Sequence, residues 1–203
     1  MTGRAIACVA AACLFVAGNM AQAQSAAYSF ADPVNGFSST QGNDGVQFRL
    51  TADIRVTALG YYDRNQNGLS QSHPVGIYSV SSQSLLASAT VGAGSSLVGL
   101  FRYESITPLD LSAGESYRLV GFHPGTGVGG DLYQIIPVGS VTIASPIVHE
   151  GNYNNLDSML SYPTNGPAMT NIFFGPNFLY VPEPSTGLLT LLAAIALAAR
   201  RRM

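Results

Sequence analysis

Apolar and polar residues alternate with a period of two along much of this chain, in short runs that end at turn residues. Residues 46–50 read Val-Gln-Phe-Arg-Leu, and residues 54–58 read Ile-Arg-Val-Thr-Ala. Because successive side chains of a β-strand point to opposite faces, this pattern predicts strands with one buried face. Asn67-Gly68 and Ser112-Ala-Gly114 are typical of the turns that connect such strands.

Further segments have the same strand character, and none of them alternates with an amphipathic helix. They are residues 75–80, 85–91, 100–106, 117–121, 132–136, 141–143, 172–174 and 178–180. About ten short strands separated by turns predict an all-β fold, a single jelly-roll-like β-sandwich over residues 24–180. Residues 152–167 are rich in Asn, Pro and Tyr, and we expect them to form a long surface loop.

The composition of residues 24–180 excludes several classes of protein. This body contains five arginines, no lysine and ten carboxylates, so its formal charge is 5 − 10 = −5. A protein that neutralises nucleic-acid phosphates needs a basic surface, which this composition cannot supply. The only cysteines, Cys8 and Cys13, precede the body, so we expect a fold stabilised by its hydrophobic core rather than by disulfides.

The first 23 residues have the three parts of a secretory signal peptide. Arg4 provides positive charge, residues 5–17 are apolar, and Ala21-Gln22-Ala23 is an A-x-A cleavage sequence. Cleavage after Ala23 would leave a mature, exported chain that begins at Gln24. The alternative is that this segment stays uncleaved as a membrane anchor.

The C-terminal 23 residues combine a proline motif, an apolar run and a basic end. Pro182-Glu183-Pro184 cannot continue a helix and predicts an extended linker. Residues 187–199 are uncharged and rich in Leu and Ala, which predicts a helix of about 20 Å, shorter than the roughly 30 Å hydrocarbon core. Arg200, Arg201 and Arg202 can extend the span by snorkelling and predict a cytoplasmic C-terminus. The alternative is a C-terminal helix packed on the domain.

This arrangement resembles the PEP-CTERM protein-sorting signal of exported Gram-negative bacterial proteins. The resemblance rests on Pro182, Glu183 and Pro184, followed by the short apolar segment and by three terminal arginines. It implies recognition of Pro182–Pro184 and cleavage nearby by an exosortase, a membrane transpeptidase-like enzyme. It also implies a membrane anchor before processing, a stop and orientation role for Arg200, Arg201 and Arg202, and a place in exopolysaccharide or biofilm-matrix biology.

The centre of the chain, about residues 37–121, resembles a family of uncharacterised exported bacterial β-sandwich domains. The stretches that carry this resemblance are residues 54–63, 73–78, 85–88 and 101–117. They occupy strand and turn positions, so the resemblance implies a fold rather than an activity.

Residues 63–68 match the first half of a calcium-binding loop. Asp63, Asn65 and Asn67 supply oxygen ligands at alternate positions, and Gly68 permits a sharp turn. The twelfth position, where such loops carry a bidentate Glu, is Pro74. The alternative is that Asn67-Gly68 forms a tight hairpin turn capped by Asp63.

Catalytic motifs are weak. His149-Glu150 lacks the second His of a zinc-protease motif because residue 153 is Tyr, and His73 and His123 lie far away in sequence. Residues 121–130 are glycine-rich but lack the Lys-Ser/Thr of a phosphate loop, which favours an inter-strand loop. A carboxylate pair for glycoside hydrolysis would have to converge in space.

Tyrosines are numerous, and their aromatic faces suit the stacking of sugar rings. The alternative is ordinary sheet tyrosine, since this residue favours strands. The tyrosines concerned are Tyr61, Tyr62, Tyr78, Tyr103, Tyr133, Tyr153 and Tyr162.

Three functions remain in view. The first is a non-enzymatic cell-surface or matrix protein with a structural or adhesive role. The second is a carbohydrate-binding module, with calcium as an optional stabilising ion. The third is a glycan-active hydrolase.

Overall fold

The computed structural model describes residues 23–31, 41–125, 131 and 134–183, and almost all of its regular elements are strands. The strands are β1 (Ser25–Ala26), β2 (Tyr28–Ser29), β3 (Gly42–Leu50), β4 (Ile54–Tyr62), β5 (His73–Ser79), β6 (Leu85–Val91), β7 (Ser96–Val98), β8 (Phe101–Leu111), β9 (Ser116–His123), β10 (Gln134–Pro137), β11 (Thr142–Ile143), β12 (Ile147–Asn155), β13 (Asn165–Ala168), β14 (Asn171–Phe174) and β15 (Pro176–Pro182). One short 3₁₀ turn, η1, covers Val138–Ser140.

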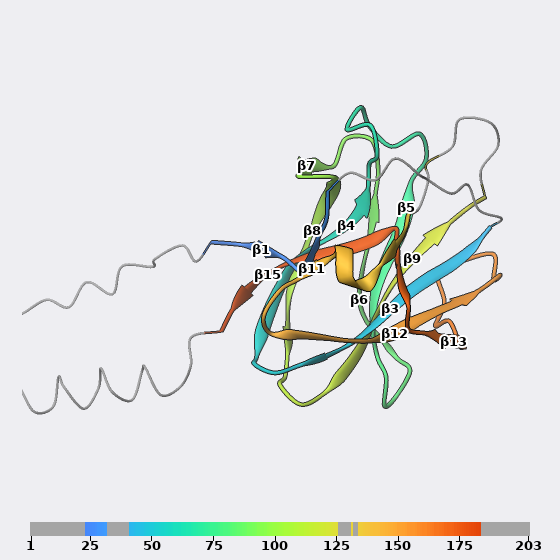
Figure 1. The fold of residues 1–203 in the computed structure, drawn as a ribbon. Coiled ribbons are helices and arrows are strands. Elements are labelled where there is room, and N and C mark those ends of the chain that lie inside the picture. The colour runs from blue at the N-terminus through green and yellow to red at the C-terminus, as the bar shows by residue number, and fades with distance from the viewer. Residues whose placement is uncertain (1–22, 32–40, 126–130, 132–133, 184–203) are drawn as a thin grey trace, which may run out of the picture.

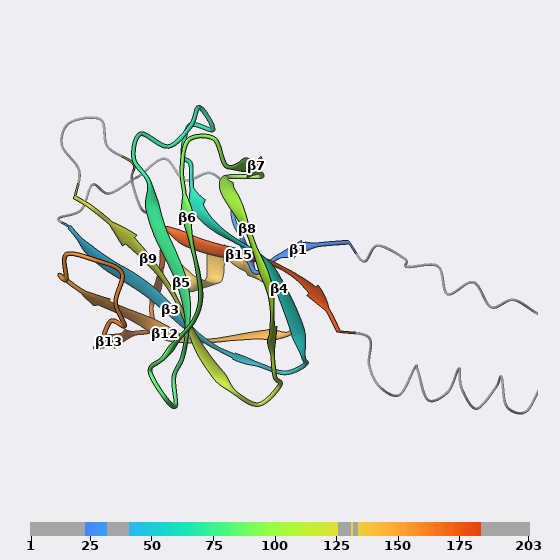
Figure 2. The ribbon, with the colours of Figure 1, turned by 180° about the vertical axis from the view of Figure 1, so that it is seen from behind.

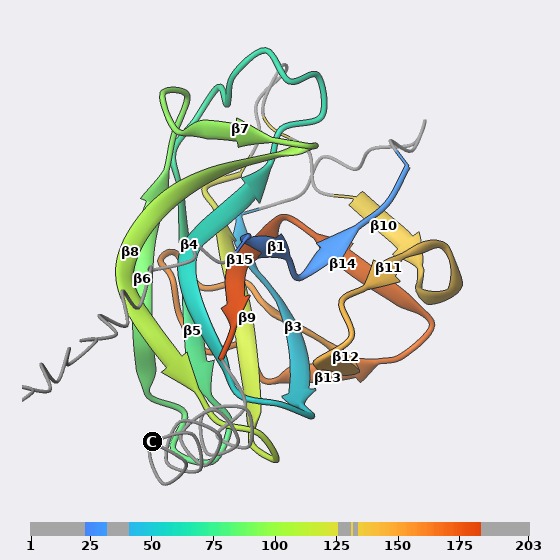
Figure 3. The same cartoon turned by 90° about the vertical axis from the view of Figure 1, so that its left-hand side faces the viewer.

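Two antiparallel sheets make up most of the structure (Figures 1 and 2). One sheet has five strands in the order β1-β15-β4-β8-β7, and the other has six in the order β13-β12-β3-β9-β5-β6. Two short pairs, β10 with β14 and β11 with β2, complete the structure, and β14 contacts β3 and β12 (Figure 3). The predicted all-β sandwich is therefore confirmed.

The core lies between the two sheets and follows the alternation seen in the sequence. On β3, Val46, Phe48 and Leu50 are fully buried, whereas Gln47 and Arg49 between them point to the other face and are partly exposed. The ring of Phe48 meets the ring of Phe178 from β15 in the five-stranded sheet, with 5.3 Å between centroids. Full burial of one such side chain contributes about 1.5–3 kcal/mol, so the alternating apolar positions hold the two sheets together.

Each predicted strand overlaps an observed one, and the sequence placed β6 at its observed bounds, Leu85–Val91. The largest difference concerns residues 152–167, which were expected to be a loop. β12 takes the first part of this segment and pairs with β3 along its whole length, and β13 takes the last part. The loop prediction was wrong at both ends of this segment. The polar side chains there make hydrogen bonds within the sheet: Asn152 Nδ2 donates to the carbonyl oxygens of Ala168 and Asn171.

The fold reaches two residues further toward the C-terminus than the expected boundary at residue 180. Pro182, the first residue of the proline motif, pairs with Ile54 at the end of β15 instead of standing in a free linker. The expected signal peptide up to Gln22, and the expected helix over residues 187–199, lie outside the described residues. In the part of the chain that the structure describes, no helix is long and apolar enough to cross a membrane.

Candidate functional site

The end of β15 brings the proline motif into contact with the five-stranded sheet. The backbone N–H of Glu183 donates to the carbonyl oxygen of Asp53 at 3.2 Å. The Glu183 carboxylate lies 3.2 Å from Nε of Arg55, which also forms a bidentate pair with Asp110 at 2.6 and 3.0 Å. The hydrogen bonds from Arg55 lower the pKa of Asp110 below its ordinary value. Arg55 therefore holds two carboxylates on the solvent side of the sheet.

The other residues predicted for export and sorting are placed only in part. Ala23 is exposed and precedes β1, which begins at Ser25. The expected recognition residue Pro184, the cleavage-site residue Ala21, and the terminal Arg200, Arg201 and Arg202 lie outside the described residues.

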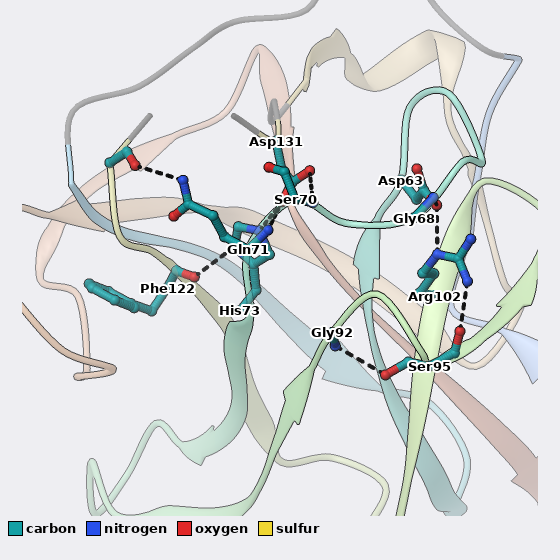
Figure 4. Close-up of polar contacts among 11 residues, drawn as sticks. Asp63, Gly68, Ser70, Gln71, His73, Gly92, Ser95, Arg102, Phe122 and Asp131 are labelled. Atoms are coloured by element: carbon teal, nitrogen blue, oxygen red, sulfur yellow. Dashed lines mark hydrogen bonds and ion pairs between the residues drawn. The ribbon is translucent and has the colours of Figure 1, made fainter. Parts of the chain in front are cut away.

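The loop between β4 and β5 lies at the opposite end of β4 from this junction. β4 has nine residues, from Ile54, which pairs with Pro182, to Tyr62, which precedes the loop. At about 3.3 Å per residue step, the two ends of β4 are roughly 26 Å apart. The loops at this far end, shown in Figure 4, therefore point away from the chain's C-terminal exit.

Asp63 is the centre of the first polar network at that far end (Figure 4). Its Oδ2 accepts hydrogen bonds from the N–H of Gly68 at 3.0 Å and from Nε of Arg102 at 2.7 Å. Arg102 in turn donates to the carbonyl oxygen of Ser95 at 2.9 Å. Asp63 is buried, and its charge is balanced by the guanidinium.

This geometry bears on the calcium hypothesis. Asn65 and Asn67 are exposed, whereas the Asp63 carboxylate accepts the N–H of Gly68, as the alternative expected. The hairpin of that alternative is wrong, because β4 and β5 belong to different sheets. A calcium ion bound at Asp63 would lie beside the positively charged guanidinium of Arg102. Among the described residues, no group of three or more His, Asp or Glu side chains is arranged to hold a metal ion.

A second network at this end joins the same loop to Asp131 (Figure 4). The Asp131 carboxylate accepts the N–H groups of Ser70 and Gln71 at 2.9 and 3.0 Å, and it lies 2.8 Å from Nε2 of His73. Nδ1 of His73 faces the carbonyl oxygen of Phe122 at 3.2 Å, so each ring nitrogen has an acceptor oxygen within hydrogen-bond distance. Burial acts to raise the pKa of Asp131, but the hydrogen bonds from His73, Ser70 and Gln71 outweigh it and lower this pKa.

Nothing in the sequence indicated this network. His73 is almost fully buried and its ring stacks on Tyr61 with 3.7 Å between centroids. Its carboxylate partner lies 58 residues away in the chain, beyond a glycine-rich stretch. A motif of closely spaced residues could not reveal the His73–Asp131 pair. The pair forms because β5 pairs with β9 and because the chain after β9 brings Asp131 back beside His73.

The three histidines occupy separate environments. His73 contacts Asp131, and Nε2 of His123 lies 3.1 Å from Oδ2 of Asp44. His149, on β12, is different: neither of its ring nitrogens reaches solvent or has a hydrogen-bond partner within the described structure. Burial lowers the pKa of His149, and the nearby Glu150 only partly opposes this shift.

We expect His149 to weaken the fold as the solution becomes acidic. The unfolded chain binds a proton near the ordinary pKa of 6.5, but the folded ring resists protonation, so the free energy of unfolding falls as the pH drops below 6.5. Replacing this unpartnered ring by an apolar side chain, His149→Leu, should raise stability by about 1 kcal/mol at pH 7. Urea unfolding of both proteins at pH 7 and pH 5 measures this. An equal loss on acidification in both proteins would show that His149 is not responsible.

A third cluster surrounds Arg118 on the outer face of the six-stranded sheet. The guanidinium carbon lies 3.4 Å from the ring centroid of Tyr153 and 4.2 Å from that of Tyr162. The same group donates to the carbonyl oxygen of Pro163 and to Oε1 of Gln47. Arg118 is 3% exposed, so the segment after β12 folds back over the sheet and covers it.

The tyrosines considered for a sugar-binding platform pack within the fold. Tyr61, Tyr62, Tyr78 and Tyr103 are buried, and Tyr153 and Tyr162 stack on Arg118. Tyr133 lies outside the described residues.

A shallow groove of about 470 Å³ runs between β6 and β8. Its lining carries no titratable side chain and consists of Leu86, Ala87, Ser88, Ser105, Ile106, Thr107, Pro108 and Leu109. General acid–base catalysis needs a titratable group within hydrogen-bond reach of the substrate, which these residues do not provide.

Most of the described carboxylates have a contact that stabilises the fold. The pairs are Asp44 with His123, Asp53 with the Ala113 N–H, Asp63 with Arg102, Glu104 with Ser95, Asp110 and Glu183 with Arg55, Asp131 with His73, Glu150 with Arg49, and Asp157 with Ser161. These acids bind turns and neighbouring strands, as structural residues do.

Comparison with known proteins gives no family. No protein-family model and no curated protein matches the chain, so the resemblances of its tail and its centre are used below only as proposals.

Proposed function

We propose that this protein is exported and serves, without catalysis, as a structural or adhesive component of the cell surface or extracellular matrix of a Gram-negative bacterium. Its N-terminal segment would direct export. Its C-terminal segment would act as a PEP-CTERM signal, holding the chain in the membrane until an exosortase-type enzyme processes it. Exopolysaccharide is the partner that this setting suggests.

The observation that carries the proposal is the junction at the end of β15. The last strand finishes at Pro182, and the proline motif begins with that same residue. The last described strand therefore overlaps the start of the motif by one residue, and removal of everything after Glu183 would leave every described strand in place. A processed tail requires that its removal spare these strands.

The position of the loops supports a surface role. The loop after β4 and the β6–β7 turn lie at the far end of β4, roughly 26 Å from the C-terminal exit at about 3.3 Å per residue step. A tail held in a membrane would present these loops outward. They are braced by Asp63–Arg102 and Asp131–His73, so they would offer a fixed surface to a matrix partner.

The carbohydrate-binding alternative has less support. A solvent-exposed tyrosine platform would favour it, but no described tyrosine is exposed. Likewise, the hydrolase alternative would be favoured by two free carboxyl groups about 5–10 Å apart in a cleft, and the groove between β6 and β8 has no carboxyl group in its lining.

Changes in the tail should disturb sorting and leave the sandwich folded. We expect Glu183→Gln, and deletion of Arg200, Arg201 and Arg202, to accumulate unprocessed or misoriented chain in the native host. Among the described residues the Glu183 side chain makes a surface ion pair with Arg55, so its replacement should change the free energy of unfolding by less than about 1 kcal/mol. Immunoblots of membrane and medium fractions, with urea unfolding of the purified proteins, measure both effects.

Glu115→Gln is the matched control, because Glu115 is an exposed carboxylate in the turn before β9. It should fractionate like the wild type. If both tail variants also fractionate like the wild type, the proposed sorting signal is wrong.

A further inference from the structure

We propose that Arg55 is a latch that holds Glu183 against the sheet and so slows access of the processing enzyme to the proline motif. This inference rests on the proposed function, because it concerns the regulation of the same C-terminal site. It assigns to a residue of the sandwich a role in the timing of tail removal.

Backbone pairing holds the first two residues of the motif on the sheet. β15 remains paired with β4 through Tyr180, Val181 and Pro182, and the N–H of Glu183 donates one more hydrogen bond, to the carbonyl oxygen of Asp53. The first two residues of the motif therefore continue the edge of the folded domain. An enzyme that binds this motif as a free extended peptide must first detach them from β4.

The side-chain contact reinforces this pairing. Arg55 on β4 lies directly opposite Val181, and its guanidinium reaches the Glu183 carboxylate at 3.2 Å. Asp110 on the neighbouring strand β8 binds the other side of the same guanidinium. Asp110 thus keeps the Arg55 guanidinium oriented toward Glu183 when the Arg55–Glu183 contact is broken, so the contact can form again without reorientation of Arg55.

The latch is weak, as a reversible device must be. The side chains of Arg55 and Glu183 are 45% and 32% exposed, and solvent screens ion pairs of this kind. Loss of such a pair should raise the detached population by about two- to five-fold. That change is large enough to alter a processing rate and too small to unfold the sandwich.

The test is a pulse-chase measurement of processing in the native host. Arg55→Ala should shorten the half-time for conversion of the full chain to the processed form by about two- to five-fold. Arg55→Lys keeps the positive charge and should restore most of the wild-type rate. Arg49→Ala removes a comparable surface pair, with Glu150 on the other sheet, and should leave the rate unchanged.

A second measurement separates the latch from the proposed function. Hydrogen exchange of the purified full chain should show faster exchange of the Glu183 amide in Arg55→Ala than in the wild type or in Arg49→Ala. If the wild type is never processed, the proposed function is wrong. The exchange rate of the Glu183 amide in Arg55→Ala then shows by itself whether Arg55 holds Glu183 against the sheet. Equal processing and equal Glu183 exchange in wild type and Arg55→Ala would overturn the latch while leaving the sorting signal intact.

Discussion

Arg118→Ala should cost about 2–4 kcal/mol of stability, because it removes charged hydrogen bonds and two stacking contacts from one buried group. The guanidinium joins β9 to Gln47 on β3, to Tyr153 on β12 and to the returning segment at Tyr162 and Pro163. Without it, we expect residues 156–164 to lift from the sheet. Urea unfolding measures the loss, and limited proteolysis should show earlier cleavage in that segment.

Two further variants make this prediction specific. Arg118→Lys keeps the charge but lacks a planar group to lie between two rings, so it should recover only a minor part of the lost stability. Arg49→Ala removes an exposed arginine from the adjacent strand and should cost less than about 1 kcal/mol. If Arg118→Ala costs no more than Arg49→Ala, Arg118 does not hold the returning segment.

Asp131→Ala should have the second largest effect, about 2–3 kcal/mol, because it leaves the buried His73 and two backbone N–H groups without their acceptor. The loss should concentrate in the loop between β4 and β5, which these contacts brace. Urea unfolding at pH 7 measures the total, and faster hydrogen exchange at Ser70 and Gln71 would locate it. Asp110→Ala, which removes an exposed ion-paired carboxylate, should cost less than about 1 kcal/mol.

The effect of Asp131 should depend on pH in a defined direction. The pKa of Asp131 is lower in the folded protein than its ordinary value of 3.8, so its contribution to stability is fully present above that value. As the pH falls through the folded-state pKa, the carboxylate is protonated and the contribution is lost. The stability difference between wild type and Asp131→Ala should therefore shrink below about pH 4. A difference that stays constant from pH 7 to pH 3 would contradict this assignment.

The strands could be predicted because their signal is local. The alternation of β3 and the apolar run of β6 both appear within a few residues. β12 was missed because it is rich in Asn and Gly, and what makes it a strand is pairing with β3, whose residues are about 100 positions away. Tertiary pairing overrides β-propensity at such positions.

The polar clusters could not be predicted for the same reason. The Asp63 turn was offered as an alternative to a calcium loop, but its partner Arg102 lies 39 residues further along the chain. Arg118 meets two tyrosines from a segment that was expected to be a loop. The proline motif was recognised from its sequence, whereas its contact with Arg55 depends on the register between β4 and β15.

The intact mass of the protein recovered from membrane and medium fractions of its native host shows whether the tail is removed. We expect a species that lacks residues 1–23 and everything beyond about residues 182–185. A full-length tail found only in the membrane fraction would show that no processing takes place and would identify a permanently anchored surface protein.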